Sequence, residues 1–439
     1  MSSALRPMAG VLAAMAVALT GTRVSAIALP WFVLTTTGSA AQTGLVAFAE
    51  MAPYVLVKAL TGPLVDRVGP RRISWITDIV SAVAAGTMVG LYAFDLLPWG
   101  GLIALVVVVG AARGPGDLAK EIMVPEAADR GQVPLERATG LMGVTERLAQ
   151  AVGPAAGGAV VAVLGPMASL GISAVCFLLG SVIVAWALPR GMGRRVPAPQ
   201  GQEGEDEGYW RRFWQGFAFL RGEPLLLAMA IMIAVTNLLD AAFVQVLAPV
   251  WAKESGYGPA VLGLNSSVVG AAAVGGSLVA ALVAHRMRRR PLFFVAFLFA
   301  GAPRFLILAA DVPLWALLAV FALSGFGGGF LNPILGAVSY ERVPRHLLGR
   351  VNALSDALAW AGIPLGGLLG GVAVAAVGLK PVLLTCAAAY ALTTNLTGLR
   401  PEWREMDRRR VTPEPRRATG SAPRSDARDP DRTGPPPAP

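Results

Sequence analysis

The sequence predicts an all-α integral membrane protein in which twelve transmembrane helices form two pseudo-symmetric six-helix bundles. The 439-residue chain is 55% hydrophobic and only 15% charged, and its mean hydropathy is +0.60, a composition that excludes an ordinary soluble domain. Apolar runs of about 20 residues, the length of helix that crosses a bilayer core, recur twelve times. Residues of the first half also recur at a fixed offset in the second half.

The first bundle is predicted over residues 1–190. Its six spans are 8–34, 42–60, 73–95, 100–120, 138–164 and 167–188. The first span follows Arg6 in the manner of a secretory signal, but it is too long for one and contains Arg23. We therefore expect it to be retained as a membrane span.

Residues 191–222 are predicted to form a cytoplasmic linker. The stretch VPAPQGQEGEDEG is acidic and rich in Pro and Gly, and it lacks the apolar residues that a folded core needs. The following YWRRFWQGFAFL has aromatic residues at helical spacing beside two arginines, which indicates an amphipathic helix on the membrane surface. The alternative is a plain extension of the seventh span.

The second bundle is predicted over residues 223–400. Its spans are 224–251, 259–284, 292–309, 313–338, 351–377 and 381–399. The remaining tail, 401–439, is rich in Arg, Pro and Asp and ends in GPPPAP. Because such a composition cannot bury enough apolar surface to fold, we expect this tail to be disordered.

The positive charge of the chain predicts its orientation. The net charge is +10, and the arginines fall in alternate connections and at both ends of the chain. Positively charged loops stay in the cytoplasm, so both termini are expected there, and the basicity does not indicate a nucleic-acid partner. The preference for Arg over Lys is typical of a GC-rich bacterium. Together with the twelve spans, it predicts a multi-pass protein of a bacterial inner membrane.

The two halves repeat each other. An offset of 210 residues relates Pro134 to Pro344, Pro154 to Pro364, Glu146 to Asp356, Gly157 to Gly367 and Cys176 to Cys386. An offset of 219 residues relates Gly44 to Gly263, Arg67 to Arg286 and Arg71 to Arg290. Six spans therefore occur twice.

The stretch GPLVDRVGPRR, residues 62–72, connects the second and third spans. Gly62 and Gly69 permit a tight turn there, and three arginines hold the loop on the cytoplasmic side. Asp66 has two options: it pairs with an arginine, or it lies at the positive N-terminus of another helix. The simpler alternative is a topology anchor without a switching role.

Two motifs resemble those of the major facilitator superfamily. Its signature loop resembles the pattern of Gly62, Leu64, Asp66, Arg67, Gly69, Arg71 and Arg72, and AHRMRRR at 284–290 resembles the degenerate second copy. GPAAGG at 153–158 is similar to the antiporter motif of drug exporters, although Ala149 stands where that family usually has Gly. The overall layout, including ALPWFVL at 28–34, is most similar to the macrolide-efflux branch of drug:proton antiporters.

This resemblance implies a latch in the first loop. In the superfamily, the aspartate at the position of Asp66 braces the loop against the eleventh span. An arginine of the loop also pairs with an acid at the end of the fourth span, here Glu126. The resemblance further implies alternating access by two rocking bundles around a central cavity, which the first, fourth, seventh and tenth spans line.

Charged residues within the spans are costly and need a function or a partner. Arg23 and Asp240 lie near the middle of the first and seventh spans, which are counterparts in the repeat, so we expect them to face each other across the pseudo-two-fold axis. Asn237 lies on the same side of its helix as Asp240. Asp240 is the first candidate for a proton-coupling residue.

The fourth span carries four charges within about 100° of one helical face. They are Arg113, Asp117, Lys120 and Glu121. One interpretation is a structural ladder that neutralises itself along the helix through i,i+4 pairs. The other makes Asp117 or Glu121 a proton carrier, while Lys120 and Glu121 are also placed to mark the cytoplasmic end of the helix.

Glu50 in the second span, Glu146 in the fifth and Asp356 in the eleventh complete the set of buried acids. A carboxyl group removed from water binds a proton more readily, so each is a candidate proton carrier. Glu146 and Asp356 also lie beside Arg147 and Arg350, so gating ion pairs are an equally good interpretation.

Small residues in two spans predict close helix contacts. We expect Gly153 and Pro154 to interrupt the fifth helix, while Gly157 and Gly158 let a neighbouring helix approach. The eleventh span repeats this pattern with Pro364, Gly366, Gly367, Gly370 and Gly371.

Other chemistries lack their motifs. No Gly-Lys dipeptide occurs, so a Walker-type ATP site is excluded. Cys176 and Cys386 are expected to be buried thiols, and the two histidines have no metal-ligating neighbours. We therefore predict a monomeric, cofactor-free, proton-coupled exporter of small amphiphilic drugs or secondary metabolites. The alternatives are a nutrient importer of the same fold and a non-transporting membrane scaffold or sensor.

Overall fold

The computed structural model describes residues 6–189, 192, 209–283, 287–344 and 348–407. Regular structure within these ranges is entirely helical. Among the described residues, eleven helices are long and apolar enough to cross a membrane, and the number is twelve if α17 is counted together with the short helix that follows it at an angle of 72°. The predicted all-α membrane fold is confirmed.

The first half of the chain contains seven helices. They are α1 (Arg6–Thr37), α2 (Ala40–Leu60), α3 (Gly62–Val68), α4 (Pro70–Ala93), α5 (Trp99–Arg130), α6 (Leu135–Leu164) and α7 (Pro166–Ala187). Ser39 caps α2 by accepting a hydrogen bond from the Gln42 backbone N–H at 3.3 Å. Proline occupies the first position of α4 and α7, where its missing backbone N–H costs no hydrogen bond within the helix.

The second half is more irregular. It contains α8 (Tyr209–Gly222), α9 (Pro224–Ala242), a π-helical turn (Phe243–Leu247), α10 (Ala248–Glu254), α11 (Ala260–Val283), α12 (Arg289–Ala300), α13 (Ala302–Ala309), α14 (Leu314–Arg342), α15 (Leu348–Ala361), α16 (Ile363–Val377), α17 (Leu379–Gly398) and a 3₁₀ helix (Pro401–Asp407). The seventh span therefore comprises α9, the π turn and α10. The ninth and eleventh spans are each two helices.

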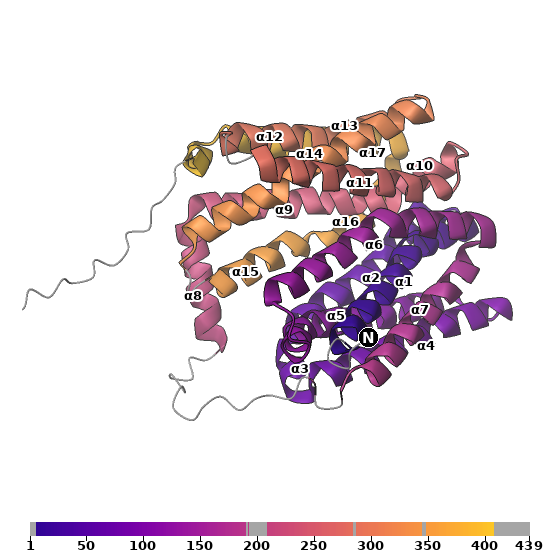
Figure 1. The fold of residues 1–439 in the computed structure, drawn as a ribbon. Helices are drawn as coiled ribbons and strands as arrows, with labels where there is room; N and C mark the ends of the chain where they lie inside the picture. The colour runs from indigo at the N-terminus through magenta and orange to yellow at the C-terminus, as the bar shows by residue number, and fades with distance from the viewer. Residues whose placement is uncertain (1–5, 190–191, 193–208, 284–286, 345–347, 408–439) are drawn as a thin grey trace, which may run out of the picture.

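The helices form two bundles, α1–α7 and α9–α17 (Figure 1). The helices α3, α8 and α15 lie at one end, which we call the basic end because its exposed arginines include Arg67, Arg72, Arg130 and Arg288. The links between α1 and α2 and between α10 and α11 lie at the opposite end (Figure 1). Most of the predicted linker, 193–208, and of the predicted tail, 408–439, lies outside the described residues.

The bundles meet through glycines near the opposite end. A Cβ atom added at Gly44 of α2 would lie 2.3 Å from the Gly367 carbonyl oxygen of α16. A Cβ atom added at Gly263 of α11 would lie 2.2 Å from the Pro154 carbonyl oxygen of α6. Because Gly44 and Gly263 are partners in the sequence repeat, the two seams are pseudo-symmetric copies of one close backbone contact.

The seam at Gly44 yields a stability prediction. We expect Gly44→Val to destabilise the protein by about 1–3 kcal/mol, because its side chain must push α16 away from α2. Gly86→Val in α4 is the matched control, since a Cβ atom there has no heavy atom within 4 Å. Thermal unfolding of the purified proteins in detergent measures the difference, and equal melting temperatures for both variants would contradict the prediction.

Three local predictions are wrong. The helix α6 is continuous through Pro154; the Gln150 carbonyl that loses its donor there lies 3.1 Å from the position of a Cβ atom on Gly270, so a neighbouring helix covers it. The loop at 62–72 contains the short helix α3, and only Gly69 has the left-handed backbone, with φ of 93°. The first part of the predicted tail, Pro401–Asp407, forms a 3₁₀ helix, in which Trp403 is fully buried against Phe293.

Candidate functional site

A ladder of polar contacts joins α2 to α5. Arg113 Nη1 lies 2.7 Å from Glu50 Oε1, the Tyr54 hydroxyl donates to Asp117 Oδ2 at 3.3 Å, and Lys58 Nζ lies 3.3 Å from Glu121 Oε1. Partners in every rung are 63 residues apart. Both helices thus contribute one residue every four positions, which places the side chains on one face of each helix. We call these six residues the three-rung ladder.

Glycines bring the two helices of the ladder close together. A Cβ atom added at Gly110 would lie 2.1 Å from the Glu50 carbonyl oxygen, and one added at Gly114 would lie 2.7 Å from the Tyr54 carbonyl oxygen. The expected ladder of i,i+4 pairs within the fourth span is therefore wrong. The charges of α5 are neutralised by α2, whose polar residues follow the same four-residue spacing.

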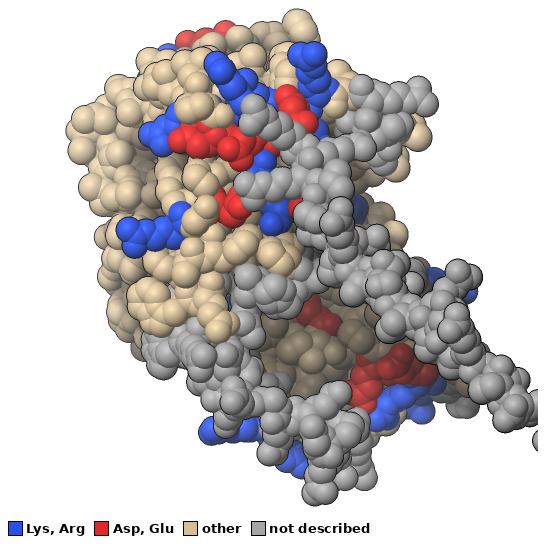
Figure 2. Space-filling view, turned by 90° about the vertical axis from the view of Figure 1, so that its left-hand side faces the viewer, with Lys and Arg blue, Asp and Glu red and all other residues tan. Residues whose placement is uncertain are grey.

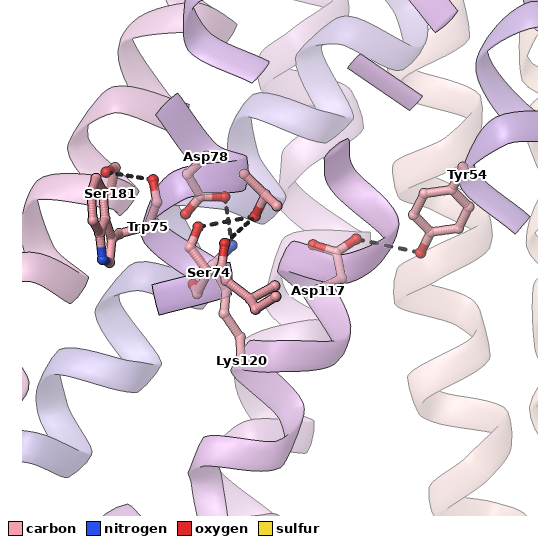
Figure 3. A network of polar contacts seen from close by, with 9 residues as sticks. Tyr54, Ser74, Trp75, Asp78, Asp117, Lys120 and Ser181 are labelled. Carbon is pink, nitrogen blue, oxygen red and sulfur yellow. Dashed lines mark hydrogen bonds and ion pairs between the residues drawn. The ribbon is translucent and has the colours of Figure 1, made fainter. Parts of the chain in front are cut away.

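The side chain of Lys120 does not lie on the ladder face of α5; it points toward α4. Its ammonium group lies 2.8 Å from Asp78 Oδ1, and both residues are buried (Figure 3). Asp78 was missed in the sequence, although a lone aspartate within the third apolar run is a signal of the same kind as Asp240. The position of Lys120 at a helix end, proposed from the sequence, does not hold because its side chain points into the bundle.

Asp240 forms an ion pair with Arg304 of α13. The guanidinium of Arg304 also lies over three aromatic rings, at 5.1 Å from the centre of Phe243, 5.3 Å from Phe305 and 5.7 Å from Tyr390. The predicted meeting of Asp240 with Arg23 is wrong, since a partner within the same bundle holds the carboxylate. Arg304 was missed, although an arginine within the ninth apolar run was the available signal.

Irregular backbone surrounds this ion pair. The π-helical turn begins three residues after Asp240 and places Phe243 beside Arg304. On the other side, Gly301 separates α12 from α13, and a Cβ atom there would lie 1.9 Å from the ring of Tyr390. π turns within helices are frequent at functional sites. Both irregularities aim side chains at one place, so the site is built by backbone geometry as well as by charge.

The glycines of GPAAGG contact two helices. A Cβ atom at Gly153 would lie 2.9 Å from Arg23 Cγ, and one at Gly157 would lie 3.1 Å from the Val24 Cα of α1. A Cβ atom at Gly158 would lie 3.0 Å from Gly263 of α11 in the other bundle. Arg23 Nε has no hydrogen-bond partner among the described residues. Close packing is thus the observed property of this motif.

Two adjoining cavities lie within the second bundle. The outer one has a volume of about 430 Å³ and extends between α9, α14 and α15, where Asp356 and Trp360 line it. The inner one, of about 300 Å³, extends to Asp240, Arg304 and Tyr390. Four residues line both cavities: Ile233, Asn237, Asn332 and Leu335. The basic end is hollowed, and acidic side chains lie in the wall of the hollow (Figure 2).

Trp360 connects the outer cavity to the first bundle. Its ring stacks on Tyr54 of the three-rung ladder, with 6.4 Å between ring centres, and Lys58 Nζ lies 5.4 Å from the centre of the Trp360 ring. Asn237 donates a hydrogen bond to the Ala359 carbonyl at 2.9 Å, which ties α9 to α15. The ladder and the cavity therefore share one aromatic wall.

Comparison with known proteins identifies the family. The model of the transmembrane secretion effector family matches residues 6–426. The chain belongs to this family. It is 31% identical over 409 residues to the multidrug efflux pump Tap of Mycobacterium tuberculosis, with 90% of this chain and 94% of that protein covered.

Two further comparisons agree. The multidrug efflux pump Tap of Mycolicibacterium fortuitum is 30% identical over 391 residues, with 88% and 94% of the two chains covered. The crystal structure of the nucleoside transporter NupG superposes with a TM-score of 0.70 at 13% identity, over 90% of this chain and 98% of that chain. The resemblance to the major facilitator superfamily is confirmed, and the protein is a multi-pass membrane transporter.

In this transporter, Arg71 holds the first loop against α7. Arg71 Nε donates to the Leu188 carbonyl at 3.1 Å and Nη2 donates to the Ala185 carbonyl at 2.6 Å. Its repeat partner Arg290 donates to the Gly398 carbonyl at the end of α17, at 2.7 Å. Each arginine thus satisfies exposed carbonyls at a helix C-terminus, a shared role that the 219-residue offset predicts.

Other residues of the predicted latch lie on α3, α4 and α5. Glu126 pairs with Arg130 at 2.7 Å, one turn along α5. Arg67 and Arg72 are exposed. The side chains of Gly62 and Asp66 lie outside the described residues, so the brace that Asp66 is expected to form stays a prediction.

The predicted gating residues are separate from one another. Glu146 is half-buried on α6 and Arg147 is exposed, and no ion pair joins these two described side chains. Asp356 is exposed and lines the outer cavity. The side chain of Arg350 lies outside the described residues. The gating role of both pairs stays a prediction.

Proposed function

We propose that the transporter exports small amphiphilic drugs or secondary metabolites in exchange for protons, by alternating access. The observation that carries the proposal is the ion pair of Asp240 and Arg304 at the inner end of the two cavities. The Asp240 side chain is 35% exposed, and it lines the inner cavity. A carboxylate that has one counter-ion and access to water can gain and lose a proton.

The aromatic rings around Arg304 stabilise the site in both protonation states of Asp240. When Asp240 is charged, it neutralises the guanidinium. When Asp240 takes up a proton, Arg304 loses this partner but keeps the faces of three rings, and each cation–π contact contributes about 0.5–2 kcal/mol. Protonation of Asp240 therefore weakens the contact between α9 and α13, while the guanidinium of Arg304 remains stabilised by the aromatic rings. Such a link is suited to couple a proton to a helix movement.

The charge pattern predicts which end of the transporter faces the cytoplasm. Positively charged loops stay inside, so the basic end and both termini are assigned to the cytoplasm of a bacterial cell, with the protein in the inner membrane. The glycine seams hold the bundles together near the opposite end, and the hollow lies at the basic end (Figure 2). This arrangement admits a compound from the cytoplasm. The Tap relatives, which are named multidrug efflux pumps, support export.

The first loop is proposed as the latch of this cycle. Arg71 fixes the loop to the first bundle, which leaves Asp66 to brace it against the eleventh span. The glycines of GPAAGG and Gly263 provide a smooth contact on which the bundles rock. The gating residues Glu146 and Asp356 lie on opposite bundles, on α6 and α15, and separate when the basic end opens.

Accumulation assays in an efflux-deficient bacterium test the proposal. Cells that express the chain should accumulate less of at least one compound from a panel of macrolides, tetracyclines, phenicols and cationic dyes. A proton uncoupler should abolish the difference. Unchanged accumulation of every compound, with confirmed membrane expression, would refute drug export, and an uncoupler-resistant difference would refute proton coupling.

A further inference from the structure

The two halves place the same helix contact in two different chemical settings. In the first bundle, Gly110 packs on the backbone of Glu50; in the second, a Cβ atom at Gly325 would lie 2.2 Å from the Val269 carbonyl oxygen. One turn further along, Gly114 packs on Tyr54 and Gly329 packs on Ala273. The pair α11 and α14 is therefore the counterpart of the pair α2 and α5, residue by residue.

This register shows what replaces the three-rung ladder. The offset of 219 residues places Val269, Ala273 and Ser277 where α2 has Glu50, Tyr54 and Lys58. The offset of 215 residues, from Gly110 to Gly325, places Gly328, Asn332 and Gly336 where α5 has Arg113, Asp117 and Glu121. Five of the six side chains of the ladder are thus matched by a smaller side chain in the second bundle, and Asp117 is matched by the uncharged Asn332, which has the same size.

The open volume follows this substitution. Val269, Ala273, Gly328 and Asn332 line the inner cavity, and Asn332 and Gly336 line the outer one. In the first bundle, the side chains of the ladder occupy the corresponding positions. The contact of the two helices is thus repeated in both bundles, whereas the two adjoining cavities lie in the second bundle, where the side chains are small.

The mouth of the outer cavity has the chemistry of a cation site. Asp356 forms no ion pair with any described side chain, and Trp360 presents its ring beside it. Lys58 Nζ already lies over that ring at 5.4 Å, which shows that the ring accepts a cation in this position. Below the mouth, the walls combine apolar side chains with polar ones; the apolar side chains are those of Leu226, Met229, Ile233 and Leu335.

The surrounding charges favour a cation as well. Around the ladder and the cavity mouth, three carboxylates form no ion pair with described side chains: Asp117, Glu146 and Asp356. Two described arginines of this region, Arg23 and Arg147, are in the same situation, so the unpaired carboxylates outnumber the unpaired arginines by three to two. Negative charge is therefore in excess where a ligand enters.

We propose that the transported compound is an organic cation that binds in the second bundle alone, with its charged centre between Asp356 and Trp360. Its apolar body occupies the outer cavity, and the amides of Asn237 and Asn332 mark the passage toward Asp240. On binding, the ligand takes the place of Lys58 at the Trp360 ring, and Lys58 keeps Glu121 as its partner. This assignment of substrate class rests on the proposed transport function.

Binding measurements on the purified full-length protein in nanodiscs test this inference. The probe is tetraphenylphosphonium, and its neutral comparison is triphenylphosphine oxide. We expect Asp356→Asn and Trp360→Leu each to weaken binding of the cation by about tenfold, the equivalent of one modest ionic contact, and to leave binding of the neutral compound unchanged. Gly336→Leu, which fills the outer cavity, should weaken both.

A matched control variant and a separate transport assay distinguish failure of the cation site from failure of the proposed transport function. Asp311→Asn removes an exposed acid at the opposite end, 95% exposed, and should bind both probes like the wild type. Equal affinity of the cation for the wild type and Asp356→Asn, or no binding of it to the wild type, would overturn the proposal. If another compound is still exported with protons, the proposed function survives that failure; if the Asp356-dependent binding occurs without any export, the binding site survives instead.

Discussion

Asp240→Asn is expected to reduce uncoupler-sensitive export to the background of empty liposomes, while substrate binding persists. The variant keeps the shape of the side chain and can still accept a hydrogen bond from Arg304, but it cannot exchange a proton. The cavity surfaces at Asn237 and Asp356 are untouched, so the ligand retains its contacts. Substrate-induced proton movement across the membrane of reconstituted vesicles measures the coupling, and equilibrium binding of the same compound measures the site.

The control for this experiment is again Asp311→Asn, because Asp311 is an exposed acid that pairs with Lys380 at the opposite end. It should transport and move protons like the wild type. Normal proton movement by Asp240→Asn would remove Asp240 from the coupling mechanism and shift attention to Asp117 and Glu121. Loss of binding together with transport would show that the residue holds the structure of the site and not the proton.

The sequence predicts the spans because each depends on local features. A run of about 20 apolar residues forms a membrane helix wherever it occurs, and the arginine pattern needs no knowledge of packing. The repeat offsets are similarly local. They correctly anticipate that Gly44 and Gly263 have equivalent contacts, and that Arg71 and Arg290 have equivalent helix ends to cap.

Partners of the charged residues could not be predicted in the same way. The spacing of Arg113, Asp117 and Glu121 identifies one helical face, but not which neighbouring helix that face meets. Lys120, one residue before Glu121, meets α4 because about 100° of rotation separates consecutive positions. Pairing therefore depends on the rotation of each helix against its neighbours, which distant contacts decide.

Breaks in the helices show the same limit. The eleventh span ends α15 at Gly362 as its Gly and Pro content predicts, whereas α6 continues through Pro154 because a neighbouring helix covers the freed carbonyl. At Gly301, the ring of Tyr390 occupies the space that a Cβ atom would take, although Tyr390 is almost ninety positions away in the sequence. Pro303, two residues later, is the local signal for this break, just as Pro364 is after Gly362.

The innermost rung of the ladder gives the second large effect. Arg113→Met should lower the free energy of unfolding by about 3–5 kcal/mol, because it leaves the Glu50 carboxylate buried without a counter-ion. The double variant Glu50→Met with Arg113→Met should recover most of this loss, since apolar side chains of similar volume can replace a buried ion pair. Thermal unfolding of the purified variants in detergent measures both changes.

The outermost rung is the internal comparison for this prediction. Its side chains are 22% and 40% exposed, against 10% and 9% for Arg113 and Glu50, so Lys58→Met should cost only about 1 kcal/mol or less. Equal losses at both rungs would show that burial does not govern the ladder. If the double variant at the inner rung also transports with normal proton coupling, the ladder serves to fill and stiffen the first bundle. In that case the proton path lies in the second bundle, which also contains the proposed ligand site.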